Sequence, residues 1–175
     1  MRAPLPFTLS VVVSLIGGGV QASASETREL ESHEHGHAKM QVAMENNKIN
    51  IEVDVPGESI VGFEHAAKTD EQKAAVAAAI KQLSDADAVF KLPSAAGCKV
   101  ASADVELHQE GDHNAFEAAY QFTCSNLAAA TSLETNLFVL YPSIEEIDVD
   151  YIATSGQGSG ELEAGSPVLS FGSGS

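Results

Sequence analysis

Residues 38–55 read AKMQVAMENNKINIEVDV, and this stretch decides the fold. From Ile49 to Val55 every second residue is aliphatic and the residues between are polar, which is typical of a strand with one buried face. Asn46-Asn47 separates this run from residues 38–45, and asparagine tolerates the positive φ that a type I′ turn requires at both central positions. The stretch therefore predicts a β-hairpin.

Helix signals follow the hairpin. Residues 59–65 (SIVGFEH) have no clear period and predict a loop or short turn packed on the sheet. Thr69 and Gln72 form a capping box at the start of an alanine-rich run whose apolar residues recur at helical spacing. These signals predict one well-defined helix over about 70–83, and residues 84–87 offer a cap for a further short turn.

A second hairpin is predicted over residues 98–124. Pairing Cys98 with Cys124 sets a register that places Leu107 opposite Ala115. In this register the aromatic residues of the second strand share a face with Cys124, whereas Val105 and Leu107 lie on the opposite face of the first strand from Cys98. The apolar residues of the two strands would therefore point to opposite sides of the hairpin. Either both faces of the hairpin are covered, or a β-bulge shifts the pairing.

The first 24 residues predict a signal peptide. Arg2 gives a short positive region, residues 5–20 form an apolar run too short for a membrane span, and Ala22-Ser23-Ala24 has the small-residue pattern of a cleavage site. We expect cleavage after this pattern, export to the periplasm and a soluble mature protein; an uncleaved anchor is the alternative. In that oxidising compartment Cys98 and Cys124 are expected to form a disulfide, whereas a thiolate metal site would need reduced cysteines.

The remaining patterns complete one domain. Residues 126–135 predict a short helix, 147–151 an alternating strand, 156–160 a turn and 161–171 a last strand. The expected fold class is α+β, with antiparallel β-hairpins forming one or two sheets, the helix at about 70–83, and a second short helix as an option. The expected organisation is a signal peptide (1–24), a histidine-containing segment (25–37), a single α+β metal-binding domain (38–171) and a disordered tail (172–175).

The composition excludes two classes of partner. The chain has 175 residues and a formal net charge of −16. A protein of this charge does not neutralise a phosphate backbone or bind an anionic membrane surface, so nucleic acids and such membranes are excluded as partners. The acidity fits a soluble protein in a compartment where cations are collected.

Three histidines alternate in the segment Ser32–His37 (SHEHGH), directly before the first predicted strand. In an extended segment residues i, i+2 and i+4 point to one side, so His33, His35 and His37 can face one ion. Zinc takes three or four nitrogen, oxygen or sulfur ligands, and imidazole and carboxylate must supply them once the cysteines are oxidised. The segment predicts a zinc site; a mobile tail that binds metal adventitiously is the alternative.

A firm site needs a further ligand from a rigid element. His65 is the first choice because it follows closely after the first hairpin, His113 is the second and His108 the third. Glu64 is a candidate ligand, or the carboxylate that orients an imidazole. The alternative for these histidines is a structural or solvated role.

Two other groups of metal-binding side chains are interpreted as structural. Met40 and Met44 offer soft thioethers for copper, but their period-2 spacing indicates core residues of a strand. The acidic residues between positions 145 and 150 are interpreted as a solvated strand face, with weak calcium binding as the alternative.

Several short motifs follow one another in a set order along the mature chain. They are residues 33–38 (HEHGHA), 61–65 (VGFEH), 96–98 (AGC), 113–116 (HNAF), 120–124 (YQFTC) and the segment 147–158, which ends in SGQG. Their order and spacing resemble the ZrgA family of exported, zinc-regulated zinc-uptake proteins. The resemblance implies a periplasmic zinc-binding protein that helps to supply zinc to an import system.

The chain departs from this family pattern in two places. The loop 108–113 lacks the long histidine- and aspartate-rich run that is usual in the family. Ala115 stands where the family pattern has aspartate, which removes one ligand or acceptor. One or two ordered zinc sites are therefore expected, and not a store of high capacity.

Three functions compete at this point. The first is a zinc-binding protein that captures the metal and delivers it to an importer, without catalysis. The second is an exported zinc-dependent hydrolase, for which Glu64 is the one candidate general base; no H-E-x-x-H signature is present. The third is an exported structural or interaction domain whose histidines are incidental.

Overall fold

A computed structural model describes residues 36–111 and 113–171. The expected signal peptide, His33, His35 and the expected tail at 172–175 lie outside these described residues, so the predictions made for them stay predictions. Within the described part of the chain, no helix is long and apolar enough to cross a membrane.

The first hairpin forms as its pattern predicts. Strands β1 (His37–Glu45) and β2 (Lys48–Pro56) pair antiparallel. Asn46 and Asn47 have φ angles of 50° and 61°, the left-handed values that a type I′ turn needs. One face of both strands is buried, and it includes both methionines of β1, so these methionines are core residues as predicted.

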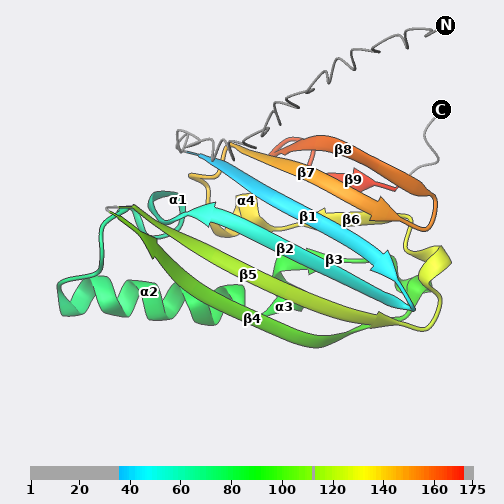
Figure 1. Ribbon diagram of the computed structural model, residues 1–175, viewed down its shortest axis with the longest axis horizontal. Coiled ribbons are helices and arrows are strands. Elements are labelled where there is room, and N and C mark those ends of the chain that lie inside the picture. The colour runs from blue at the N-terminus through cyan, green and yellow to red at the C-terminus, as the bar shows by residue number, and fades with distance from the viewer. Residues whose placement is uncertain (1–35, 112, 172–175) are drawn as a thin grey trace, which may run out of the picture. The chain divides into compact units, whose positions relative to one another are not determined.

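The hairpin lies in the middle of a six-stranded sheet (Figure 1). The strand order is β4–β5–β2–β1–β7–β8, where the further strands are β4 (Cys98–Glu110), β5 (His113–Cys124), β7 (Glu146–Ala153) and β8 (Gly156–Glu163). Neighbouring strands run antiparallel except β1 and β7, which run parallel. This parallel pair, absent from the predicted arrangement of hairpins, joins the first strand to a segment near the other end of the chain.

A β-bulge resolves the conflict in the second hairpin. The pairing of β4 with β5 shifts by one residue between Val100 and Ser102. As a result Leu107 lies opposite Phe116, and not opposite Ala115 as predicted. The shift places the apolar residues of β4 on the same face as the buried side chains of β5, because a one-residue slip exchanges the two faces of a strand.

A disulfide joins the ends of the second hairpin. Cys98 and Cys124 are bonded to each other and lie directly opposite in the register of β4 and β5. These are the only two cysteines of the chain, so neither is left as a thiolate ligand for a metal.

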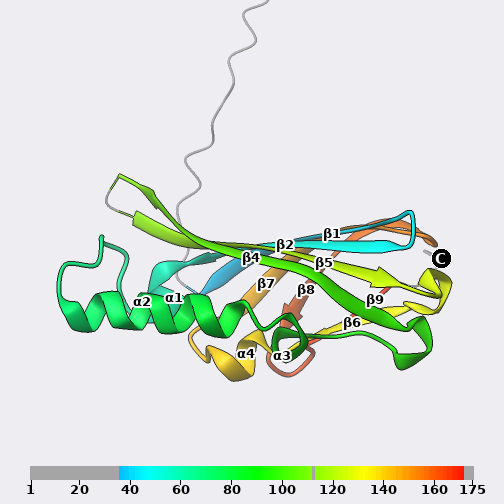
Figure 2. The same ribbon diagram turned by 90° about the horizontal axis from the view of Figure 1, so that it is seen from below.

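Helices and a small sheet cover one face of the six-stranded sheet, and no described helix or strand covers the other face (Figure 2). The covering layer comprises α2 (Asp70–Leu83), α3 (Ala86–Val89), α4 (Leu137–Leu140) and a sheet of order β3–β6–β9, made of β3 (Phe90–Lys91), β6 (Ser132–Thr135) and β9 (Val168–Ser170). The connecting turns are α1 (Gly57–Val61), η1 (Ser94–Ala96) and η2 (Leu127–Ala129). The fold is thus α+β, and we call the two sides of the large sheet the covered face and the open face.

Helix α2 begins and ends where its pattern predicts. Its capping box is formed by Thr69, whose side chain accepts a hydrogen bond from the amide of Gln72, while the side chain of Gln72 accepts one from the amide of Thr69. Glu71 lies in the first turn, and its carboxyl group is exposed. Hydrogen bonds from the backbone amide of Glu71 and from the side chain of Thr69 lower the pKa of this carboxyl.

Aromatic and aliphatic side chains join the helical layer to the covered face. The hydroxyl of Tyr120, on β5, donates a hydrogen bond of 2.9 Å to the carbonyl of Leu83 at the end of α2. The rings of Tyr120 and Phe90 pack edge to face with centroids 5.1 Å apart. Burial raises the pKa of Tyr120 far above the usual tyrosine value.

Two predictions near the C-terminus are wrong in part. Residues 156–160 begin strand β8 and are not a turn, because pairing with β7 orders this glycine-rich run. A Cβ at Gly158 would lie 2.7 Å from the hydroxyl of Tyr151, so a larger residue at this strand position would have to displace the Tyr151 ring. In residues 126–135 the predicted short helix is limited to the single 3-10 turn η2, and strand β6 takes up the end of the segment.

Candidate metal centre

The described candidate ligands gather at one end of the six-stranded sheet (Figure 1). Strands β1, β5 and β7 begin at this end, and strands β2, β4 and β8 finish there. We call it the histidine end; it carries His37, Glu64, His65, His108 and His113, and the acidic start of β7. The topology of the sheet therefore collects residues that are far apart in the sequence.

The tightest group at the histidine end joins β1 to β7. His37 lies on the open face, and its Nδ1 atom is 3.6 Å from Oε1 of Glu146. The ligand atoms of His37, Glu146 and Asp148 all lie within 4.8 Å of one another. One imidazole and two carboxylates form a donor set that zinc accepts, and three protein ligands suffice for a site that keeps an exchangeable position. The group fits a zinc ion.

The backbone explains why these three side chains meet. The carbonyl of Gly36 accepts hydrogen bonds from the amides of Glu145 and Glu146, at 2.8 and 3.2 Å, which aligns the start of β7 with the start of β1. In the parallel register His37 pairs with Glu146, and Asp148 follows two residues later on the same face. Gly36 has a φ of 85° and a Cβ there would lie 3.0 Å from Cγ of Glu145, so glycine suits this junction.

A second group lies where β5 begins. The Nδ1 atom of His113 is 2.6 Å from Oε2 of Glu64, which lies in the loop after α1. The Glu64 side chain is only 22% exposed, so its carboxylate is held close to the surface of the sheet end. A carboxylate on one ring nitrogen orients the imidazole and makes the other nitrogen a better metal ligand, which is the orienting role predicted for Glu64.

A hydrogen bond from Asn114 holds the backbone of His65 beside this second group. The Asn114 side chain is buried, and its amide donates a hydrogen bond of 2.9 Å to the carbonyl of His65. The Asn114 side chain also packs on Gly57, where a Cβ would lie 1.5 Å from Oδ1 of Asn114. The His65 ring is exposed and stacks on Phe63 with centroids 5.2 Å apart.

The structure separates the candidates into two groups and one outlier. His37 is carried by β1 and His113 by β5, which are two strand spacings apart, or about 10 Å. His108 is exposed and lies opposite Ala115, and among the described residues no contact joins it to the other candidates. The described histidines therefore do not lie in one group, and they fit two neighbouring sites better than a single one.

Sequence reasoning missed Glu146 and Asp148 as candidate zinc ligands. Their alternation with buried residues was read as a solvated strand face, and they do lie on the open face. The missing information was the parallel pairing of β7 with β1, since only this pairing brings the two carboxylates to His37. An alternating acidic strand is a weak signal, because many such strands bind nothing.

The chain matches one family of known proteins. Residues 32–171 match the sequence profile of the ZrgA family of zinc uptake proteins, and this match covers the two groups described above. No curated protein sequence matches the chain. The family is one of uptake proteins and not of enzymes, and because the match covers most of the chain, the protein belongs to the ZrgA family of zinc uptake proteins.

Proposed function

We propose that this protein binds zinc in the periplasm and passes it to a zinc-import system. Zinc is its cargo, and catalysis has no part in this role. The observation that carries the proposal is the group of His37, Glu146 and Asp148, whose ligand atoms lie within 4.8 Å of one another in a chain of a zinc-uptake family. The signal peptide expected from residues 1–24, the disulfide and the acidic composition support export.

The first zinc site uses His37, Glu146 and Asp148. A neutral imidazole and two carboxylates balance the charge of one zinc ion, which removes the repulsion between the carboxylates. His35 and His33, two and four residues before His37 in the sequence, are the candidates for the fourth ligand. The side chains of His37 and Glu146 are 36% and 28% exposed, which leaves the ion accessible to a receiving partner.

A second zinc site uses His113 and His65, with Glu64 as the carboxylate that orients His113. The contact between Glu64 and His113 supports this assignment, and the bond from Asn114 to His65 holds the loop beside it. His108 lies near the tip of the same hairpin and is the third candidate ligand for this site. Two sites of this kind suit a protein that gathers a few ions, since its loop at 108–113 is short.

Zinc titration of single variants tests the first site. His37→Ala and Glu146→Gln are each expected to weaken the tighter binding step by at least tenfold, or about 1.4 kcal/mol, because each removes a ligand. The matched control is Glu45→Gln, which removes an exposed carboxylate at the opposite end of β1. The measurement is competition with a chromophoric zinc chelator, and equal affinities for His37→Ala and the unmodified protein would contradict the assignment.

A lower pH tests the donor set in the same way. Ligating imidazoles must be neutral, so zinc affinity should fall as the pH drops from 7 towards 5. A crystal grown with zinc, with anomalous scattering to locate each ion, then assigns the sites directly. Ions found away from both groups would overturn the proposal.

A further inference from the structure

One row of charged side chains crosses the open face and passes beside the proposed first zinc site. The pairing of neighbouring strands places its six members directly opposite one another, from β4 at one edge of the sheet to β8 at the other. In strand order they are Glu106, Glu117, Asp54, Lys39, Asp148 and Glu161. We call this the charged row; all six of these described residues are exposed, and Lys39 is the one cation among them.

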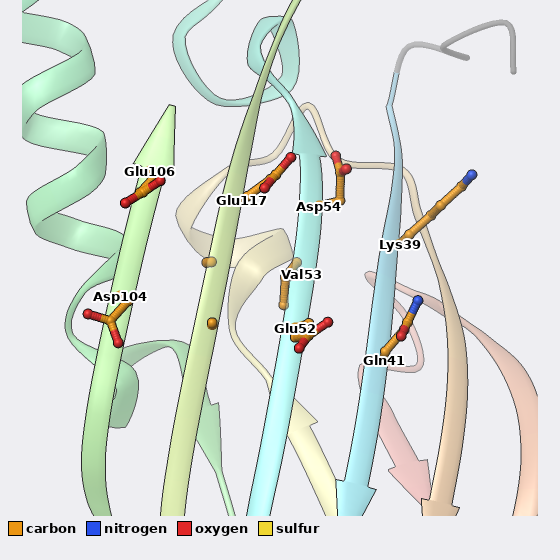
Figure 3. A pocket seen from close by; sticks show the side chains of 10 residues that line it. Lys39, Gln41, Glu52, Val53, Asp54, Asp104, Glu106 and Glu117 are labelled. Atoms are coloured by element: carbon orange, nitrogen blue, oxygen red, sulfur yellow. The ribbon is translucent and has the colours of Figure 1, made fainter. Parts of the chain in front are cut away.

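Lys39 lies between two carboxylates of the charged row. Its register partner is Asp54 on β2 and Asp148 on β7. Adjacent strands are about 4.8 Å apart, so a long lysine side chain can reach either carboxylate. Figure 3 shows the ammonium group of Lys39 pointing away from Asp54, to the side of β1 on which β7 lies. The positive charge therefore stands on the Asp148 side of β1.

Asp148 is also a ligand of the proposed first zinc site. Its ligand atom lies within 4.8 Å of those of His37 and Glu146. His37 precedes Lys39 by two residues on β1, so the imidazole and the ammonium group project from the same face of the sheet. A zinc ion held by these three side chains and the ammonium group of Lys39 therefore compete for one carboxylate.

The charge of Lys39 acts in opposite directions on the two forms of the protein. In the zinc-free form it offsets the repulsion between Asp148 and the neighbouring carboxylates of the charged row. In the zinc-bound form it stands beside a divalent cation and repels it. A protonated lysine has no lone pair to offer a metal, so Lys39 acts on zinc through its charge alone. Both effects lower the zinc affinity of the site.

We propose that Lys39 competes with zinc for Asp148, limits the affinity of the first site and speeds the release of the ion. The inference rests on the proposed function, because it concerns the same zinc site. It adds control of zinc release by a residue that does not bind the metal. Such control suits a protein that passes its ion to an import system, since an ion that is held too tightly is not delivered.

Zinc binding by matched charge variants tests the inference. Lys39→Met keeps an unbranched side chain without the charge. In chelator competition at low ionic strength it should bind zinc about threefold to tenfold more tightly, and with excess chelator it should release the ion more slowly by a similar factor. Lys39→Arg keeps the charge and should stay within about twofold of the unmodified protein.

The control variant is Lys48→Met. Lys48 also lies on the open face, opposite Glu45 and therefore six residues further along the sheet than Lys39, or about 20 Å away. Its removal changes the net charge by the same amount. Because this distance exceeds the screening length of the buffer at physiological ionic strength, the zinc affinity of Lys48→Met measured there should stay within about twofold of that of the unmodified protein.

A measurement on zinc-free protein tests the contact between Lys39 and Asp148 directly. Lys39→Met should raise the equilibrium constant of unfolding, measured by urea denaturation. The increase should be about twofold larger or more when Asp148 is present than in the Asp148→Asn background, because the second variant has already lost the partner charge. Circular dichroism of each variant without urea checks that the fold is kept.

Three results would overturn the inference. They are an unchanged or weaker zinc affinity of Lys39→Met, an equal gain of affinity in Lys48→Met, and no coupling between Lys39 and Asp148 in the zinc-free protein. If His37→Ala weakens zinc binding in the same assay, the zinc site stands and only the role of Lys39 is lost. If His37→Ala binds zinc as tightly as the unmodified protein, the site itself is wrong and the role of Lys39 falls with it.

Discussion

The covered and open faces of the six-stranded sheet are built from the same strands, with residues alternating between them. On the covered face Ile49, Ile51 and Phe116 have no exposed surface, and they pack against the helical layer. On the open face most of the alternate residues are polar or charged, among them Asn50, Glu52 and Glu117. The difference teaches that stability and ligand chemistry are assigned to opposite sides of each strand, so each can be changed without the other.

The largest effect is expected from a truncation on the covered face. Phe116→Ala should lower the free energy of unfolding by about 3–5 kcal/mol, because it leaves a cavity in a fully buried position. Urea denaturation measures this loss. The matched control is Glu117→Ala, the next residue of β5, which points to the open face. An equal loss for both variants would break the distinction between the two faces.

The next effect concerns the disulfide at the end of the second hairpin. Replacing Cys98 and Cys124 by serine should lower the free energy of unfolding by roughly 3 kcal/mol, since the crosslink restricts the unfolded chain. The zinc affinity of the folded variant should stay unchanged, because neither sulfur is a ligand. If zinc affinity, measured by chelator competition, also falls, the covered side of the hairpin contributes to metal binding.

The sequence predicted the elements whose signals are local. The type I′ turn at Asn46-Asn47, the capping box at Thr69 and the helix to Leu83 each depend on residues within a few positions of one another. The alternation of β1 and β2 likewise assigned the two methionines of β1 to the core. Local rules suffice here because no distant contact competes with them.

Features that depend on pairing between distant segments could not be predicted from the sequence. The parallel contact of β1 with β7 decides that Glu146 and Asp148 meet His37, and nothing in either strand alone specifies its neighbour. The bulge between Val100 and Ser102 was one of two open solutions to a parity conflict, and only the paired structure selects it. The arrangement of the candidate ligands in two groups therefore results from the order of strands in the sheet, and not from a local signal in the sequence.

A smaller effect is expected for the buried hydroxyl of Tyr120. Tyr120→Phe should cost about 1 kcal/mol at neutral pH, because the carbonyl of Leu83 loses its donor. Burial raises the pKa of Tyr120 in the folded state, so the folded protein keeps a proton that the unfolded chain releases near pH 10. The stability gained from this proton is complete below pH 10 and is lost as the pH rises further.

The pH profile of unfolding separates this contribution from simple packing. The unmodified protein should lose stability more steeply above pH 10 than Tyr120→Phe, and Tyr151→Phe should keep the steep profile as the matched control. The contrary result is that all three proteins lose unfolding free energy equally steeply above pH 10. The Tyr120 hydroxyl would then ionise as easily in the folded state as in the unfolded chain, and the covered face would be more accessible to water than its packing indicates.

The smallest expected effect has the opposite sign and lies on the open face. Glu117→Gln should raise the free energy of unfolding by about 0.2–1 kcal/mol, because it removes one charge from between Glu106 and Asp54. Added salt should stabilise the unmodified protein more than the variant, since screening relieves the same repulsion. A loss of stability in Glu117→Gln, measured by urea denaturation at low salt, would mean that the open face contributes to the fold through its charges. The separation between a face for stability and a face for ligands would then hold only at the histidine end.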